Sequence, residues 1–382
     1  MIVSKVILKN WRNFKSVEAE LGERVFLAGP NASGKSNFLD VFRFLRDIAK
    51  PGGGLQQAVR QRGGLSKIRC LAARKEPNLE IEIHLTSIAG KKAEWRYALG
   101  IRQEVRGYRQ PLLAYERVWR GGKQLLDRPN AEDRADELRL TQTHLEQINA
   151  NVQFRDVAKF LESVLYLHLV PQLLRYANAF AGPELAGDPF GRNFLERIAK
   201  TPEKTRRSRL HKIEKALGFA VPQLQQLTDT KDETGVPHLE ANYVHWRSQG
   251  AKQREDQFSD GTLRLIGLLW SLWEGDSLLL LEEPELSLNS GIVRSLPALM
   301  YRVQREKKRQ IILSTHSADL LADKSIGGEE TLLLIPSAEG TEVKLASSID
   351  VVRALLEGGF SVAEAALPHT IPPEVHKLEL YR

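Results

Sequence analysis

The chain has 382 residues, a net charge of +7 and 42% hydrophobic residues, a composition that is ordinary for a globular protein and excludes wholesale disorder. A single cysteine, Cys70, excludes an internal disulfide and a cysteine-rich zinc site, which fits a reducing cytoplasm. No apolar stretch approaches the roughly 18 residues of a membrane helix, and the N-terminus lacks the apolar core of a signal peptide. We therefore expect a cytoplasmic protein with no membrane partner.

The first fifty residues predict two strands and a helix. Residues 2–8 alternate between apolar and polar side chains, and residues 24–28 (RVFLA) form an apolar strand that leads directly into GPNASGKS. Apolar residues then recur at helical spacing and predict a helix over residues 35–49, which Pro51 and three glycines end. The resulting order is strand, glycine-rich loop and helix.

The middle of the chain changes pattern twice. Residues 78–120 contain three alternating runs, LEIEIHL, EWRYALGI and LLAYERVW, which predict an antiparallel sheet with turns near Gly90 and Gly107. Residues from about 138 to 218 predict mostly helices, without the sustained heptads of a long coiled coil. After about residue 257 the alternation of helices and strands returns. The predicted elements there are helices at Thr262–Trp273 and Gly291–Lys308 and strands at Ser277–Leu281 and Gln310–Ser314.

The segment GPNASGKS has the spacing of a phosphate-binding loop, G-x-x-x-x-G-K-[ST]. Glycines at its first and sixth positions let the backbone curl so that successive N–H groups face phosphate oxygens, and the following helix adds the positive end of its dipole. Lys35 brings a positive charge to the β and γ phosphates, and the Ser36 hydroxyl is a ligand for Mg²⁺. ATP and Mg²⁺ are thus the predicted ligands. The residues predicted to bind the nucleotide are Gly29, Pro30, Asn31, Ala32, Ser33, Gly34, Lys35, Ser36 and Asn37.

The segment SLLLLEEPE is an apolar strand that ends in carboxylates. P-loop ATPases use such a strand to deliver one acid to the metal and another to the attacking water. Glu282 is predicted to hold Mg²⁺ together with Ser36, and Glu283 to orient or deprotonate the water. A core strand that enters a solvated acidic turn would look the same, but the phosphate loop upstream favours the catalytic interpretation. IILSTHS places His316 after another buried strand, where the imidazole could contact the γ phosphate.

The segment QFSDGTLRL places Ser259, Gly261 and Thr262 at a predicted helix N-terminus. A serine hydroxyl and N–H groups without helical partners bind anions well at such a position. An ordinary helix N-cap formed by Ser259 or Asp260 explains the same residues, and both interpretations can hold together.

These four segments, in this order, resemble the ABC-type ATPase heads of the SMC, RecF and OLD group. GPNASGKS resembles the Walker A motif, FSDGT the ABC signature, LLLLEEPE the Walker B motif and STHS the switch-histidine loop, and the opening KVILKNWRNFKS resembles the group's first strand and turn. The resemblance implies an α/β P-loop NTPase fold, with an ABC-type ATPase head, an antiparallel β lobe and a helical insertion. The expected parts are residues 1–137 (N-terminal part of the head), 138–250 (mainly helical insertion) and 251–382 (C-terminal part of the head).

The resemblance also implies a mechanism that one subunit cannot complete. In ABC-type heads, ATP lies between the Walker A loop of one subunit and the signature of another, so Ser259 and Gly261 would face the γ phosphate of the partner's nucleotide. The expected partner is a second copy of the chain, in an ATP-dependent dimer or higher oligomer. Glu283 and His316 are the expected catalytic residues.

Two positions depart from the usual pattern of these heads. Glu282 stands where the metal-binding acid is usually Asp, and Asp260 stands where transporters usually have Gly, although SDGT resembles the RecF-like branch. The glutamine of the Q-loop is not assigned, and Gln142 is the candidate considered.

Several functions use such a head. Gly29 and Ser259 are 230 positions apart (259 − 29), which favours the RecF-like branch over a transporter ATPase, and the long coiled coil of an SMC cohesion machine is missing. Only 66 residues follow His316 (382 − 316), too few for the nuclease domain of OLD proteins. We expect a sensor or regulatory subunit of a prokaryotic defence system, with a separately encoded nuclease or other effector. A RecF-like DNA repair ATPase and a non-hydrolysing, nucleotide-gated scaffold are the alternatives.

Both the defence role and the repair role predict DNA as a partner. Dense basic charge suits phosphate contacts without giving sequence specificity, and a solvated helix face explains such a cluster equally well. The two candidate clusters are Arg197, Lys200, Lys204, Arg206, Arg207, Arg209, Lys212 and Lys215, and Arg60, Arg62, Lys67, Arg69, Arg74 and Lys75.

Overall fold

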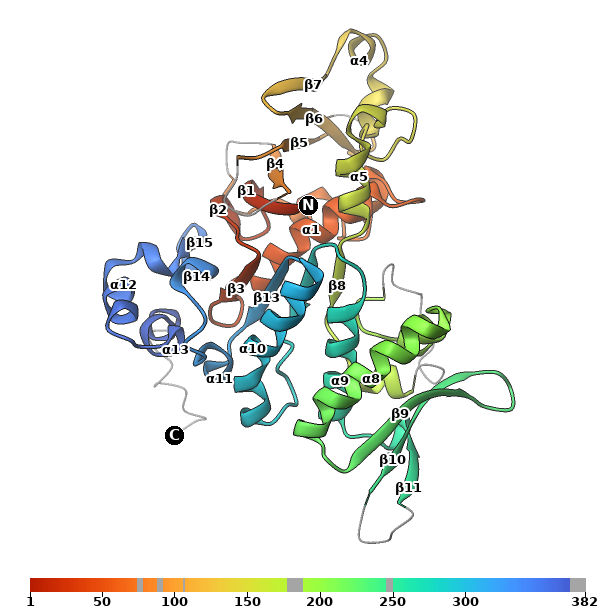
Figure 1. The fold of residues 1–382 in the computed structure, drawn as a ribbon. Coiled ribbons are helices and arrows are strands. Elements are labelled where there is room, and N and C mark those ends of the chain that lie inside the picture. The colour runs from red at the N-terminus through yellow and green to blue at the C-terminus, as the bar shows by residue number, and fades with distance from the viewer. Residues whose placement is uncertain (74–77, 88–91, 106, 177–187, 245–249, 372–382) are drawn as a thin grey trace, which may run out of the picture. The chain divides into compact units, whose positions relative to one another are not determined.

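The computed structural model describes residues 1–73, 78–87, 92–105, 107–176, 188–244 and 250–371 (Figure 1). The chain forms two compact units. The first comprises Met1–Leu165, Ser277–Leu280 and Arg309–Arg382, and the second comprises Tyr166–Asp276 and Leu281–Lys308. The three expected parts, 1–137, 138–250 and 251–382, stay a prediction, since the division by contacts follows other boundaries.

The first unit contains an antiparallel sheet of six strands in the order β2-β1-β4-β5-β6-β7. Alternate residues of its strands, such as Val6, Ile83 and Tyr97, lie opposite one another and are fully buried, so one face of the sheet is part of the core. The predicted antiparallel sheet is confirmed, while the turn near Gly90 falls outside the described residues. The strands are β1 (Ile2–Trp11), β2 (Phe14–Glu20), β4 (Leu79–Thr86), β5 (Trp95–Gln103), β6 (Pro111–Arg120) and β7 (Lys123–Arg128).

The second sheet has the order β15-β14-β3-β13-β12-β8. Its central strand β3 is buried along its whole length and pairs in parallel with β13, with Ala28 opposite Thr315. The four residues that follow Arg24 are all apolar, as is typical of a strand that is covered on both faces. The strands are β3 (Arg24–Ala28), β8 (Leu165–Leu167), β12 (Leu279–Glu282), β13 (Ile311–Thr315), β14 (Thr331–Ser337) and β15 (Gly340–Leu345).

Helix α1 (Lys35–Ala49) has the predicted bounds and is the main helix of the core of the first unit. Its apolar side chains at helical spacing are buried, and Phe44 packs on Trp11 with ring centroids 5.2 Å apart. The other helices of this unit are α2 (Leu55–Arg60), α3 (Leu65–Ile68), α4 (Ala131–Ala135), α5 (Arg155–Glu162), α11 (Ala318–Leu321), α12 (Asp350–Glu357) and α13 (Val362–Ala366).

An ion network fixes the polar side of α1. Both carboxylate oxygens of Asp40 accept hydrogen bonds from the guanidinium of Arg62. The Arg62 side chain is only 7% exposed and also donates to Asp47 at 3.1 Å. Burial alone would raise the pKa of Asp40, but the guanidinium of Arg62 holds this pKa below its usual value. Arg62 was a candidate for DNA contact, and the structure uses it inside the protein instead.

The second unit is built around α9, a helix that is buried over nearly all of its length. It also contains a three-stranded antiparallel sheet in the order β11-β10-β9, which the sequence patterns did not predict. Its helices are α6 (Pro171–Arg175), α7 (Phe194–Lys200), α8 (Glu203–Ala220), α9 (Asp260–Trp273) and α10 (Ser290–Lys307), and its sheet strands are β9 (Leu224–Lys231), β10 (Pro237–Tyr243) and β11 (Ala251–Arg254).

The described residues also contain short 3₁₀ helices. They are Glu137–Thr141, Val152–Phe154, Glu255–Gln257, Gly328–Glu330, Ala346–Ser348 and Leu367–Thr370. Of the helices in the described ranges, none is both long and apolar enough to cross a membrane.

Candidate functional site

The loop between β3 and α1 has a backbone that only small residues can adopt. Gly34 has φ +96°, and a Cβ at this position would lie 2.2 Å from the side chain of Asn13. A Cβ at Gly29 would lie 2.7 Å from the carbonyl oxygen of Leu334. Both glycines of the predicted phosphate loop are therefore required by the fold itself.

A buried cation and a helix N-terminus meet in this loop. Lys35 is 7% exposed, and its Nζ donates to the carbonyl oxygens of Gly29 (2.8 Å) and Pro30 (3.0 Å). Helix α1, all of whose residues are described, begins without a side-chain cap and without an acid in its first turn. The Ser33 hydroxyl is buried and has no hydrogen-bond partner among the described residues. A buried cation, an uncapped helix N-terminus and a buried hydroxyl together favour the binding of an anionic group such as a triphosphate.

Asn13, in the turn between β1 and β2, holds the loop in place. Its Nδ2 donates to the Ser33 carbonyl oxygen (2.9 Å) and the Thr341 hydroxyl (2.7 Å), and its Oδ1 accepts from Asn37 (2.8 Å). In the sequence, Asn13 is recognisable only as part of the N-F-K core that resembles the ABC-type heads. The amide links three segments that are far apart in the sequence.

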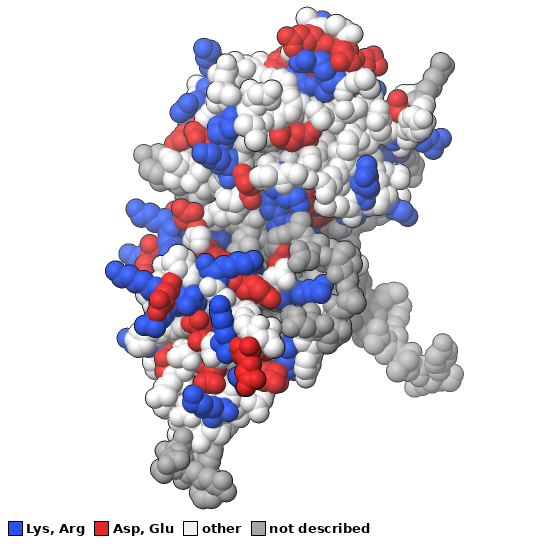
Figure 2. All heavy atoms as spheres, turned by 90° about the vertical axis from the view of Figure 1, so that its right-hand side faces the viewer, with Lys and Arg blue, Asp and Glu red and all other residues white. Residues whose placement is uncertain are grey.

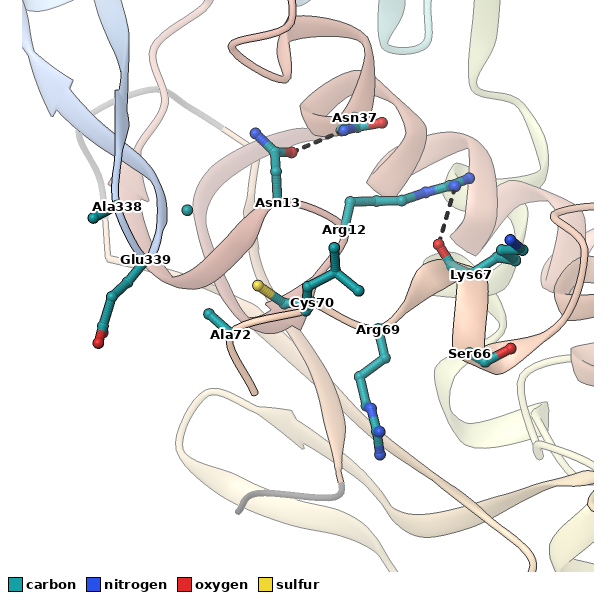
Figure 3. A pocket seen from close by; sticks show the side chains of 12 residues that line it. Arg12, Asn13, Asn37, Ser66, Lys67, Arg69, Cys70, Ala72, Ala338 and Glu339 are labelled. Atoms are coloured by element: carbon teal, nitrogen blue, oxygen red, sulfur yellow. Dashed lines mark hydrogen bonds between the residues drawn. The ribbon is translucent and has the colours of Figure 1, made fainter. Parts of the chain in front are cut away.

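A pocket of about 580 Å³ opens beside Asn13 and Asn37 (Figure 3). Its wall continues through Arg12, whose guanidinium donates to the Lys67 carbonyl oxygen, and through the segment around Cys70. The pocket adjoins the phosphate loop and is lined by both polar and apolar residues.

His316 lies at the end of the strand next to the loop. In the parallel pair of β3 and β13, Ala28 is opposite Thr315, so Gly29 and His316 are the next residues on neighbouring strands. Carboxyl ends of parallel strands meet at one edge of a sheet. The fold thus brings His316 and the phosphate loop together. Strand β12, which precedes Glu283, is next to β13 in the same sheet.

The last residue of β12, Glu282, and the next residue, Glu283, each have a distinct environment in the second unit. The Tyr166 hydroxyl donates to the Glu282 carboxylate, and Tyr166 is 4% exposed. Glu283 has φ 44°, a conformation that is uncommon for a residue other than glycine. Strain of this kind gathers at functional sites because the surrounding structure must impose it. Tyr166 was not predicted from the sequence.

The signature residues form the N-terminus of α9. Ser259 is its N-cap, and the serine Oγ accepts from the Thr262 N–H at 3.1 Å, so the N-cap interpretation is confirmed. A Cβ at Gly261 would lie 2.6 Å from the Ser287 carbonyl oxygen, so only glycine fits. Arg175 donates to Asp260 at 2.7 Å.

Gln142 was the residue considered for the Q-loop. Its carbonyl oxygen accepts from Arg128 and its side chain from Gln147. Both contacts lie in the region of β7 and the loops that follow it.

Comparison with known proteins decides the family. Residues 24–323 match the family described as AAA domain, putative AbiEii toxin, Type IV TA system. The chain belongs to this AAA family. No curated protein sequence matches the chain.

Solved SMC heads have a similar fold. A structure of an Smc head bound to the C-winged helix domain of ScpA is 15% identical, with a TM-score of 0.53 over 90% of this chain and 98% of that chain. Also similar are the SMC head domain from Thermotoga maritima (13% identity, TM-score 0.49, covering 90% and 99%) and an Smc head from Pyrococcus furiosus with an extended coiled coil, bound to the C-terminal domain of ScpA (13%, 0.49, covering 92% and 99%). By its family this chain is an AAA ATPase, and its fold is similar to that of a solved Smc head.

Most basic side chains on and around α8 of this AAA ATPase are engaged within the chain. Arg206 pairs with Asp229 at 2.8 Å, Arg209 lies over the Trp270 ring, and Lys212 pairs with Glu306 at 2.8 Å. On the face drawn in Figure 2, basic and acidic side chains lie interspersed. Lys204, Arg207 and Lys215 remain exposed. Arg74 and Lys75 of the second basic cluster fall outside the described residues.

We predict that Gly34→Ala abolishes most nucleotide binding, because the new Cβ both strains the loop and collides with Asn13. Titration with a fluorescent ATP analogue should show an affinity at least about tenfold weaker. Gly122→Ala is the matched control, since Gly122 has φ +90° and no atom within 4 Å of the added Cβ. Equal affinity of the two variants would contradict the steric argument.

Proposed function

We propose that this AAA ATPase binds and hydrolyses ATP with Mg²⁺ as an ATP-sandwiched dimer. The observation that carries the proposal is the pairing of Ala28 with Thr315, because it puts the Lys35 loop and His316 at one sheet edge. The scarcity of acids in the first turn of α1 supports a polyanionic ligand at this edge.

The nucleotide is held by two neighbouring regions of the first unit. Lys35 and the N-terminus of α1 bind the phosphates, and Ser33 offers a further hydroxyl. The pocket beside Asn13 and Asn37 takes the base and ribose, which suits its volume of about 580 Å³. Lys35 exchanges its two loop carbonyl partners for phosphate oxygens, which are stronger acceptors because they are charged.

Hydrolysis uses residues at the ends of β3, β12 and β13. Ser36 and Glu282 are the residues that would hold Mg²⁺. The bound ion would neutralise negative charge on the phosphates. Glu283 orients the attacking water and accepts its proton, and its positive φ is the strain that such a placement entails. His316 contacts the γ phosphate.

The signature completes the pocket from a second copy of the chain. Ser259, Gly261 and Thr262 lie at the N-terminus of α9, a helix of 14 residues whose dipole favours an anion there. Ser259 is exposed, so its hydroxyl is accessible to a neighbouring molecule. Dimerisation therefore requires bound ATP, and hydrolysis of the ATP lets the two copies separate.

The biological role we propose is a cytoplasmic sensor or regulatory subunit of a prokaryotic defence system, with a separately encoded effector. The family description, which names a putative toxin of a toxin–antitoxin system, supports defence over DNA repair. DNA is the proposed regulator, on the strength of the net charge of +7 and the exposed cations of α8. An Smc head that binds a winged-helix domain of ScpA is a precedent for a protein partner in this fold.

We predict that Glu283→Gln keeps ATP binding but lowers steady-state phosphate release at least about a hundredfold, because an amide cannot accept the proton of water. The ATP-bound dimer should then accumulate, which light scattering after gel filtration measures. Glu357→Gln is the control, since Glu357 is exposed on α12. Wild-type phosphate release by the Glu283→Gln variant would refute its role. A wild type that binds ATP but releases no phosphate would instead be a nucleotide-gated scaffold.

We predict that Tyr166→Phe raises the Mg²⁺ concentration needed for half-maximal ATP binding about tenfold. The reason is that the Tyr166 hydroxyl orients the carboxylate of Glu282, which is longer than the usual aspartate. The measurement is binding of a fluorescent ATP analogue as Mg²⁺ is titrated. In a Glu282→Asp background, Tyr166→Phe should have little further effect, because the shorter aspartate does not reach the Tyr166 hydroxyl to accept its hydrogen bond. An identical shift in both backgrounds would show that Tyr166 acts only through folding.

A further inference from the structure

The carboxylate of Asp260 is bound on both oxygens by residues of one helix. Arg175 donates to its Oδ1 at 2.7 Å, and Gln172 donates to its Oδ2 at 2.6 Å. Both donors belong to α6, and all three residues belong to the second unit. The Arg175 side chain is 14% exposed and that of Asp260 34% exposed, so this ion pair is partly shielded from water.

Arg175 also fixes the backbone that leads into the signature. Its guanidinium donates to the carbonyl oxygen of Phe258 at 2.6 Å, directly before Ser259. One side chain thus restrains the residue on each side of Ser259. The Ser259 hydroxyl is restrained in turn by Thr262, through the N–H at 3.1 Å and the hydroxyl at 2.8 Å.

A free carboxylate at position 260 would oppose the approach of a triphosphate. It is adjacent in sequence to the serine that binds the γ phosphate in the proposed dimer, and like charges brought together in an interface weaken association. Arg264, on the same helix, is buried and has Glu283 and Glu285 as well as Asp260 for neighbours. The direct counterion of Asp260 is Arg175, whose guanidinium lies 2.7 Å from the carboxylate.

We propose that Arg175 is a positioning residue for the signature: it neutralises Asp260, holds this carboxylate toward α6 and sets the backbone before Ser259, so that the signature can close on the partner's ATP. This inference rests on the proposed ATP-sandwiched dimer. It also explains how the signature accommodates an aspartate at position 260, where transporter ATPases usually have glycine. Arg175 acts through Asp260 and Phe258 and does not contact the nucleotide.

The test uses the full chain with Mg²⁺ and a slowly hydrolysed ATP analogue, and measures the dimer dissociation constant by analytical ultracentrifugation. Arg175→Ala should weaken the dimer about tenfold or more, while each monomer binds the fluorescent ATP analogue as the wild type does. Arg175→Ala with Asp260→Asn should regain most of the wild-type affinity, because the repelling charge is gone. Asp260→Asn alone should dimerise nearly as well as the wild type, since an amide can still pair with Gln172.

Controls separate charge from folding. Arg207→Ala removes an exposed arginine of α8 that pairs with Glu203, and it should leave the dimer unchanged. Arg175→Lys keeps the positive charge and should lose less affinity than Arg175→Ala, even if α6 is destabilised. Wild-type dimerisation by Arg175→Ala, or a double variant no better than Arg175→Ala, would overturn the inference. A wild type that stays monomeric with the analogue would refute the proposed function itself, and the inference with it.

Discussion

The loop from Gly29 to Ser36 must connect the buried strand β3 to helix α1 and still leave room for a polyanion. Several segments of the first unit hold this loop in place. Strand β3 is anchored by parallel pairing with β13, and Asn13 ties the loop to the β15 hairpin. Lys35 is buried against loop carbonyls and has no acid beside it in the first turn of α1. The buried Lys35 ammonium and the uncapped N-terminus of α1 both favour an anionic ligand at this loop, and this supports the functional proposal.

Two sequence departures have local partners that explain them. Glu282 carries one more methylene than the usual aspartate, and its carboxylate is held by Tyr166. Asp260 adds a negative charge to the signature, and that charge is matched by Arg175. In each case the altered residue and its partner lie in the second unit, so the change and its compensation form one local structure. Neither departure argues against ATP chemistry.

Strand β3 and helix α1 were predicted with the bounds that the structure has, because an apolar run, a glycine-rich loop and an amphipathic helix are all local signals. The sheet β9–β11 was missed since strands such as β11 carry mostly exposed polar residues. Asn13, Tyr166 and Arg175 were missed for another reason: their partners lie 20, 116 and 85 positions away, and only the folded chain brings them together. Conversely, Arg62 looked like a surface cation and is buried in an ion network.

The most direct measurement of the central claim is phosphate release by a mixture of two variants that are each inactive, Lys35→Ala and Ser259→Arg. If one pocket is built from the loop of one copy and the signature of another, each mixed dimer contains one intact pocket. An equal mixture should then recover about a quarter of the wild-type rate, since half of the dimers are mixed and each has one of two pockets intact. No recovery at any mixing ratio, or full activity of Ser259→Arg alone, would contradict a shared pocket.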